Sequence, residues 1–161
     1  INENLNITIL NLTAIPTKYD NIKSVVGDAR DLNQYSDKSF DIVFSNSVIE
    51  HLDTFIDQKR MAKEIKRVGK KYYIQTPNYY FPLEPHFMFI GFQWLPLYLK
   101  IRVLKYYNSG YKHRIKNKES AIRIANSIRL LKEKEIKKLF PKSKINKERF
   151  LGLTKSFVIT N

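Results

Sequence analysis

A succession of strand, helix and strand between residues 39 and 75 constrains the fold of this chain most strongly. Residues 39–45 (SFDIVFS) form a near-continuous apolar run, which is typical of a strand covered on both faces, and residues 71–75 (KYYIQ) form a second run. Between them, apolar residues recur near helical spacing as far as Val68, and Asp53 is expected to cap this helix. Two strands joined by a helix pair in parallel through a right-handed crossover, so the sequence predicts an α/β fold.

Shorter apolar runs and turn signals on both sides extend this unit. The further strands are expected at residues 6–10, 24–26, 144–150 and 152–160, and the further helices at residues 119–127 and 133–140. The last two strands are joined by Leu151-Gly152, which favours an antiparallel hairpin. We therefore expect one domain over residues 1–161, with a mostly parallel sheet and an antiparallel C-terminal hairpin.

An aromatic and proline-rich stretch at about residues 78–111 interrupts this pattern and is interpreted as an insertion. Its most apolar part, residues 87–99, contains Gly91 and Pro96 and is shorter than the roughly 20 residues that a membrane-spanning helix needs. We expect a lid or a substrate-facing pair of helices.

The composition narrows the class of protein. The net charge is +14, but lysine far outnumbers arginine and no arginine cluster accompanies it, so a general charge bias is favoured over a nucleic-acid-binding surface. The chain has no cysteine, which excludes disulfides and thiolate metal sites, and we expect no metal site. The opening INENLNITIL lacks the features of a secretory signal, which favours a cytoplasmic location.

Polar and small residues follow three of the expected strands at the point where each strand ends. They are Asn11 and Leu12 after the first strand, Asp28 and Ala29 after the second, and Ser45, Asn46 and Ser47 after the third. Ligands of open parallel sheets bind beyond the carboxyl ends of the strands. A carboxylate such as Asp28 can accept from an adenine amino group, and Asn11 can hold a ribose hydroxyl, so a nucleoside-shaped ligand is expected.

The stretch VVGDARDLNQYSDKSFDIVFSNSVIEHL, residues 25–52, resembles the class I methyltransferases that depend on S-adenosylmethionine, and in particular their type 11-like domain. The TPN at residues 76–78 and the ending KKLFPKSKINKERFLGLTKSFVIT are similar to the close of the same fold. The resemblance implies a Rossmann-like sheet of seven strands with S-adenosylmethionine as cofactor. It also implies that Asp28 and Ala29 lie at the adenine, and Asn46 and Ser47 near the methionine end.

Two departures from the family pattern stand out. The family usually has an acidic residue that holds both ribose hydroxyls, whereas this chain has Asn11. The first strand and the glycine-rich loop of the fold, which would precede Asn6, are missing. We therefore expect an N-terminally truncated fragment that is inactive on its own.

The resemblance implies methyl transfer to a small-molecule, sugar or lipid-linked acceptor. His86 is the first candidate for a general base and His51 the second, although a packed histidine remains an equal interpretation of His86. Two alternatives stay open. One is a peripheral-membrane methyltransferase that acts on an isoprenoid or lipid acceptor, because basic residues flank residues 87–99, and the other is a non-catalytic binding or scaffold protein.

Overall fold

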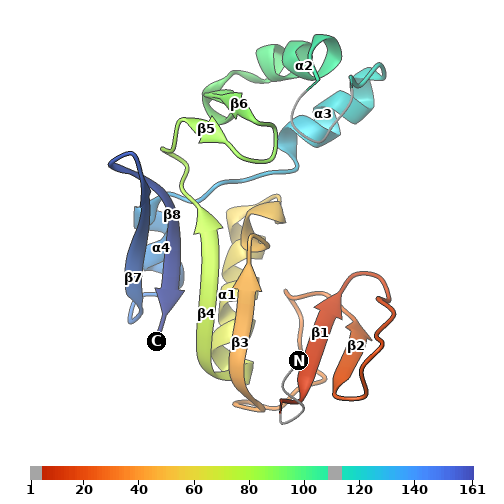
Figure 1. The fold of residues 1–161 in the computed structure, drawn as a ribbon, viewed down its shortest axis with the longest axis vertical. Coiled ribbons are helices and arrows are strands. Elements are labelled where there is room, and N and C mark those ends of the chain that lie inside the picture. Colours follow the sequence, from red (N-terminus) through yellow and green to blue (C-terminus); the bar gives the residue numbers. More distant parts are fainter. Residues whose placement is uncertain (1–4, 109–113) are drawn as a thin grey trace.

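The computed structural model describes residues 5–108 and 114–161, which form a body built on strands and a smaller part above it (Figure 1). The elements are β1 (Ile7–Asn11), β2 (Ile22–Val26), β3 (Phe40–Asn46), η1 (Ile49–His51), α1 (Phe55–Val68), β4 (Gly69–Pro77), β5 (Leu83–Glu84), β6 (Phe89–Ile90), η2 (Phe92–Trp94), α2 (Leu97–Tyr106), α3 (Lys118–Asn126), α4 (Glu133–Leu139), β7 (Lys144–Phe150) and β8 (Leu153–Thr160).

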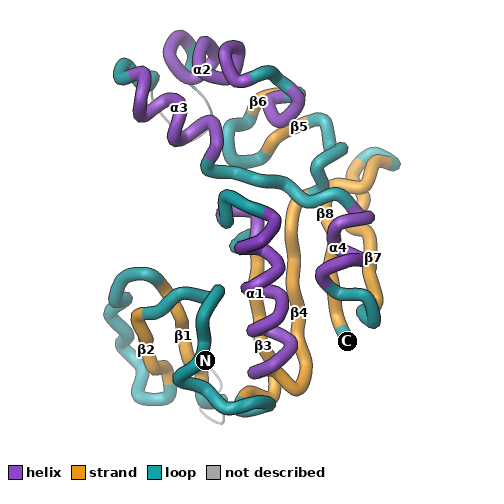
Figure 2. Tube along the Cα trace, turned by 180° about the vertical axis from the view of Figure 1, so that it is seen from behind, coloured by secondary structure: helices purple, strands orange, loops and turns teal. Residues whose placement is uncertain are grey.

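The strand, helix and strand unit predicted from the sequence is confirmed. β3 and β4 pair in parallel, and α1 connects them. The apolar stripe of α1, which includes Met61, Ala62 and Ile65, is buried against residues of β4, β8 and α4 in the core of the body. Figure 2 shows α1 and α4 on the same side of the sheet. The expected fold class, a Rossmann-like α/β sheet, is therefore present.

The start of α1 corrects one detail of the prediction. The N-cap is Thr54, whose hydroxyl oxygen accepts a hydrogen bond from the Asp57 backbone N–H at 3.0 Å. Asp53, which the sequence favoured as the cap, lies one residue earlier. A threonine hydroxyl satisfies the same free N–H group as an aspartate would, so both residue types were compatible with the pattern.

The terminal hairpin also forms as expected. β8 pairs antiparallel with both β4 and β7, which gives a four-stranded sheet in the order β3-β4-β8-β7. Leu151 and Gly152, with φ of 49° and 80°, form the two-residue turn between β7 and β8. Positive φ at both turn residues matches the right-handed twist of the strands that they connect.

β1 and β2 pair in parallel as a separate two-stranded sheet, so the described residues do not form the single seven-stranded sheet that the resemblance implies. β1 and β3 lie next to each other and point the same way in Figure 1, but no strand of the described chain pairs with the facing edge of either. Residues 28–37 attach the small sheet to α1, because Glu64 accepts from the Leu32 N–H and Arg67 donates to the Leu32 and Tyr35 carbonyl oxygens.

The insertion folds around a core of its own. Phe87, Phe92 and Leu104 pack there with Ala121 and Ala125. In its described part, residues 78–108, the predicted insertion contains the short helix η2 and the helix α2, which packs on α3. The predicted end of the insertion, residue 111, lies outside the described residues. A helix pair is thus present, but its second member comes from a segment that the sequence pattern assigned to the main domain.

We call residues 79–128 the lid. Its two ends are adjacent, because Asn78 and Leu131 form a parallel bridge and the Tyr79 N–H donates to the Leu131 carbonyl oxygen at 3.2 Å. Within residues 5–108 and 114–161, no helix has the length and apolar character that a membrane span requires.

Candidate functional site

The carboxyl ends of β1, β2, β3 and β4 face the lid end of the body (Figure 1). Asn11 pairs with Val26 at the last position of the β1–β2 ladder, and Asp28 follows two residues later. The Asn11 side-chain amide donates to the carbonyl and hydroxyl oxygens of Thr13, both at 3.2 Å, while Leu12 is strongly exposed. The fold therefore places Asn11 and Asp28 at one edge, as the sequence predicted, but it gives Leu12 no packed position.

Asp28 is engaged by its neighbour Arg30. The Asp28 carboxylate accepts from the Arg30 backbone N–H at 2.8 Å and from the guanidinium at two positions. The hydrogen bond from this guanidinium holds the pKa of Asp28 below its ordinary value, so the carboxylate is ionised at neutral pH. A surface cavity of about 450 Å³ adjoins both side chains and reaches Lys63 on α1. Ala29 points the other way and packs against the body core.

The three residues at the end of β3 have different environments. Ser45 is buried, and its hydroxyl has no hydrogen-bond partner among the described residues, whereas Asn46 is exposed. Ser47 has φ of 51°, in the left-handed region that non-glycine residues rarely adopt, and its hydroxyl donates to the side chain of Gln75 at 3.0 Å. This held turn directs the chain from β3 into η1.

Directly after that turn, Glu50 forms a cluster with His51 and His86. The Glu50 side chain is fully buried, and one carboxylate oxygen, Oε2, accepts from the Thr76 hydroxyl at 3.1 Å. The other oxygen, Oε1, has no hydrogen-bond partner among the described residues and lies 3.9 Å from His86 Nε2. Burial raises the pKa of Glu50. The His51 ring lies 4.9 Å from the His86 ring, edge to face.

His86 reaches the cluster from the lid, between β5 and β6, and Glu84 orients it. His86 Nδ1 lies 2.7 Å from Glu84 Oε1, and the other Glu84 oxygen accepts from the Phe87 backbone N–H at 2.8 Å. Glu84 is itself buried. The imidazole therefore lies between Glu84 of the lid and Glu50, which follows the turn at the end of β3.

Sequence reasoning named both histidines but missed Glu50 as a member of the same cluster. The adjacent pair Glu50-His51 in SNSVIEHL was visible, but the sequence contained no signal that His86 would fold back onto it. The proline-interrupted stretch around His86 has no periodicity from which its path could be derived.

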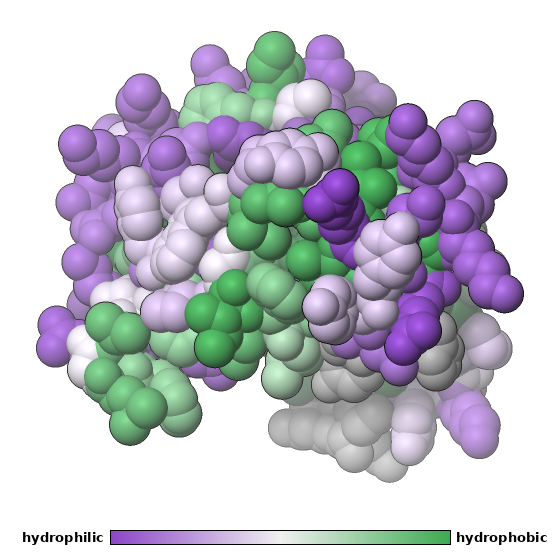
Figure 3. All heavy atoms as spheres, turned by 90° about the horizontal axis from the view of Figure 1, so that it is seen from above, coloured by the Kyte–Doolittle hydropathy of each residue, from purple (hydrophilic) through white to green (hydrophobic). Residues whose placement is uncertain are grey.

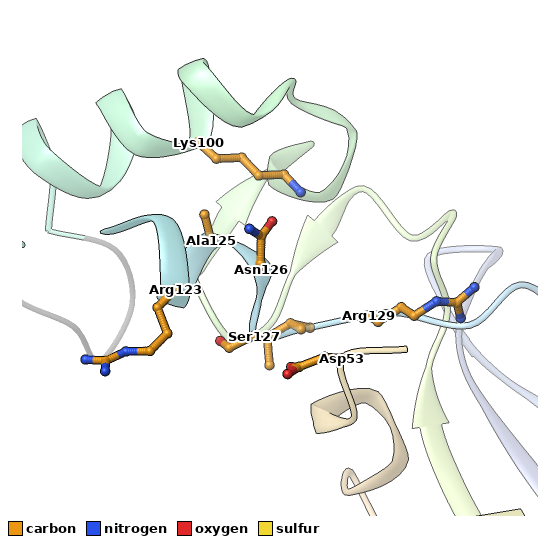
Figure 4. Close-up of a pocket in the computed structure, with 8 residues that line it drawn as sticks. Asp53, Lys100, Arg123, Ala125, Asn126, Ser127 and Arg129 are labelled. Carbon is orange, nitrogen blue, oxygen red and sulfur yellow. The ribbon is translucent and has the colours of Figure 1, made fainter. Parts of the chain in front are cut away.

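A second cavity, of about 540 Å³, lies between the start of α1 and the helices of the lid. Figure 4 shows that Lys100 extends from α2 over Asn126, while Arg123 points away from the centre. Burial lowers the pKa of Lys100. Arg129, at the other end of this cavity, donates to Gln58 and pairs with Glu135, so its charge is already matched.

Comparisons with known proteins agree with this fold. Residues 6–72 match the family model of the methyltransferase domain. Two uncharacterised proteins of Mycobacterium tuberculosis strains are 44% identical over 52 residues, which is 32% of this chain and only 18% of each relative.

Among solved structures, a S-adenosylmethionine-dependent methyltransferase from Anabaena variabilis is 11% identical, with a TM-score of 0.50 over 89% of this chain and 59% of that one. Another S-adenosylmethionine-dependent methyltransferase, from Methanosarcina mazei, is 16% identical, with a TM-score of 0.48 over 86% of this chain and 66% of that one. The TM-score of 0.50 with the Anabaena variabilis protein shows a shared fold, and the low identity leaves the acceptor undetermined.

Proposed function

We propose that this protein transfers a methyl group to a small-molecule, sugar or lipid-linked acceptor, because residues 6–72 match the methyltransferase domain and the fold is that of S-adenosylmethionine-dependent methyltransferases. The domain family and the fold imply S-adenosylmethionine as the cofactor. The observation that supports the proposal is that Asn11 and Asp28 follow strands whose carboxyl ends point toward the lid, the end of the body at which the Glu50 cluster also lies.

The residues of this edge fit the adenosine half of the cofactor. Asp28 is an ionised acceptor beside a surface cavity, which suits an adenine amino group. The Asn11 amide nitrogen is engaged by Thr13, so its carbonyl oxygen is the atom that we assign to a ribose hydroxyl. Arg30 competes for Asp28, and a bound adenine would have to share the carboxylate or displace part of the guanidinium contact.

The chemistry requires positioning more than activation. Bound S-adenosylmethionine supplies an already activated methyl group, so alignment of the acceptor and exclusion of water provide most of the acceleration. We assign acceptor binding to the space between the lid and the strand edge. His86 Nε2 is the proposed proton acceptor, because Glu84 fixes the opposite nitrogen of the ring, and His51 is the second candidate.

The test is a pair of measurements on the full-length protein. Calorimetry should detect one bound S-adenosylmethionine per chain, and labelled methyl groups should pass to an acceptor in a panel of hydroxylated small molecules, sugars and prenyl-linked sugars. Cofactor binding without methyl transfer to any acceptor of this panel would favour a binding or scaffold role. Absence of cofactor binding would refute the proposal.

One observation favours a lipid-linked acceptor over a small-molecule or sugar acceptor. Several large apolar side chains on the lid are exposed, among them Ile90, Trp94 and Tyr98, and the exposed Arg102 lies on the same helix as Tyr98. Figure 3 views the molecule from the lid end and shows apolar and aromatic residues between polar ones on that face. Exposed apolar patches rimmed by basic residues are typical of surfaces that contact anionic membranes.

We propose that this face brings the protein to lipid-linked acceptors. The protein should co-sediment with vesicles that contain phosphatidylglycerol and less with vesicles of phosphatidylcholine alone. The double variant Ile90→Ser, Trp94→Ser should lose this binding. Equal recovery with both vesicle types, or none with either, would leave only the soluble acceptors.

A further inference from the structure

The cluster at the joint between the body and the lid has the donor atoms of a metal site. Glu50, His51 and His86 each offer one ligand atom, and these atoms all lie within 4.8 Å of one another. Two imidazole nitrogens and one carboxylate oxygen form a set that suits first-row divalent ions such as Zn²⁺ and Co²⁺. Among the residues that the structure describes, no other group of three histidine or acidic side chains brings its ligand atoms this close together.

The buried carboxylate of Glu50 supplies a second, independent observation. Its Oε1 is enclosed and without a hydrogen-bond donor among the described residues, although a buried carboxylate oxygen is costly unless a donor or a cation faces it. The ionisable group of His86 faces it, with Nε2 3.9 Å away. That distance is longer than a hydrogen bond.

The orientation of His86 determines which atom faces Glu50. Glu84 lies within hydrogen-bonding distance of Nδ1, and its other oxygen accepts from the Phe87 N–H, so Glu84 acts as an acceptor on both sides. With the proton on Nδ1, a neutral imidazole presents the lone pair of Nε2 toward Glu50 Oε1. Histidines that bind metals usually donate their other ring N–H to a carboxylate in this way.

From these observations we propose that Glu50 Oε1, His51 and His86 Nε2 bind one divalent transition-metal ion, which ties the lid to the end of β3. Bonds of about 2.0–2.2 Å put the ligand atoms of a tetrahedral site roughly 3–3.5 Å apart, so the cluster contracts on binding. The His51 residue is exposed, whereas the Glu50 side chain is fully buried. Glu50 and His86 are held by Thr76 and Glu84.

Three protein ligands leave at least one coordination position open to water or to an acceptor oxygen. Only this use of the open position rests on the proposed methyltransferase function, and the metal site itself does not. A bound divalent ion lowers the pKa of an oxygen that it holds. In the metal-bound protein, the ion would assist deprotonation of the acceptor oxygen, and His86 would be a metal ligand. The role of His86 as proton acceptor applies to the metal-free protein.

The experiment titrates chelator-treated full-length protein with Zn²⁺ by calorimetry, and with Co²⁺ by visible absorption, without S-adenosylmethionine. We expect one equivalent to bind. His51→Ala and His86→Ala should each weaken binding at least about 100-fold, and Glu84→Gln, which keeps all three ligands, roughly 10–100-fold. Asp53→Asn removes an exposed carboxylate two residues from His51 and should leave the affinity unchanged.

Circular dichroism and thermal melting of each variant provide the control for folding. Zn²⁺ should raise the melting temperature of the wild type and of Asp53→Asn, but not that of His51→Ala, whose exposed ring contributes little to the core. Absence of a one-equivalent site in the wild type, or wild-type affinity in His51→Ala, overturns the proposal and leaves a His86–Glu50 ion pair as the explanation. Failure of cofactor binding with intact metal binding would refute the methyltransferase function and not the metal site.

Discussion

Several polar side chains of the candidate site are held by a partner within a few residues or on the next strand. Arg30 holds Asp28, Glu84 holds His86, and Gln75 holds Ser47. Held side chains need little reorganisation when a ligand arrives, because their rotamers are already fixed. The orientation of each candidate side chain therefore depends on a second residue, which itself need not contact the ligand.

The first residue-scale prediction concerns Asp28. Replacement by alanine should weaken S-adenosylmethionine binding by about 1–3 kcal/mol, because a buried adenine amino group would lose its acceptor. The measurement is calorimetry on the full-length protein. Asp20→Ala is a matched control, since Asp20 is exposed and precedes β2 whereas Asp28 follows it. Unchanged affinity in the Asp28 variant would remove this residue from the cofactor site.

The second prediction separates the roles of His86 and its partner. In the full-length enzyme, His86→Ala should lower turnover by roughly 10²–10⁴ and leave cofactor affinity nearly unchanged, the range expected for a lost proton acceptor. Glu84→Gln should cause a smaller loss, because the imidazole remains but its orienting carboxylate is gone. If His86→Ala costs only a few-fold in turnover under metal-free conditions, His86 is a packing residue.

The sequence was sufficient to predict the candidate residues that directly follow strands. It was not sufficient to predict contacts between residues that are far apart in the chain. Asn11, Asp28 and Ser47 could be named because the ends of parallel strands share one edge. The approach of His86 to Glu50 and the hydrogen-bond partner of the His86 ring could not be predicted, since both depend on how the lid folds over η1. No local rule determines that contact.

At the scale of elements, α1 serves as the attachment point for the β1–β2 sheet. Glu64 accepts from the Leu32 N–H at 2.9 Å and pairs with Arg67 at 2.7 Å, and Arg67 also donates to two carbonyl oxygens of residues 28–37. The hydrogen bond from Arg67 lowers the pKa of Glu64 from its ordinary value of 4.5. The loop after β2, which carries Asp28, is thus positioned by two residues of one helix.

We predict that Glu64→Ala lowers the free energy of unfolding by about 2–4 kcal/mol, because a buried N–H and a partly buried guanidinium lose their acceptor. Chemical denaturation measures this change. Because the folded-state pKa lies below the unfolded one, the stabilisation is present above about pH 4.5 and is lost as the pH falls through the folded-state pKa. The variant should therefore show a weaker acid dependence than the wild type.

Asp41→Ala is the control for this measurement. Asp41 forms a salt bridge with Lys70, but both side chains are exposed, so its loss should leave the free energy of unfolding almost unchanged. A Glu64 variant as stable as this control would show that the loop after β2 is held by other contacts.

The elements themselves were largely predictable, but their partners were less so. The strands around residues 40–46 and 69–77 have strong apolar patterns, and the turn at Leu151-Gly152 has the residue types that a tight hairpin needs. α3 was expected as a helix, yet nothing in its sequence showed that it packs on α2 rather than on the sheet. Helical periodicity identifies an apolar face and not what covers it.

At the scale of the whole molecule, the described residues form three sheets and two apolar cores. The four-stranded sheet is covered on one face by α1 and α4, while Ile42 and Phe44 on its other face are 64% and 68% exposed. The β1–β2 sheet has two strands only, and such sheets are marginally stable unless other elements support them. Its support consists mainly of the loop that binds α1.

Hydrogen exchange should reveal this difference. We predict that the backbone amides of β1 and β2 exchange faster than those of β4, which has a paired strand on both sides. Mass spectrometry of peptides from both regions after a series of exchange times measures the contrast. Equal protection in the two sheets would mean that β1 and β2 open only when the whole molecule unfolds.

The adjacency of Asn78 and Leu131 has a consequence for how such a protein can diversify. A segment whose entrance and exit touch can be exchanged as one cassette, because any replacement with similarly spaced ends leaves the path of the remaining chain intact. Here the exchanged segment contains both Glu84 and His86, so a replacement of the lid would replace the histidine together with the carboxylate that orients it. Asp28 and Asn11 stay behind on the body. Under the proposed function, the methyl acceptor could then change through exchange of the segment between Asn78 and Leu131, while the residues assigned to the cofactor stay the same.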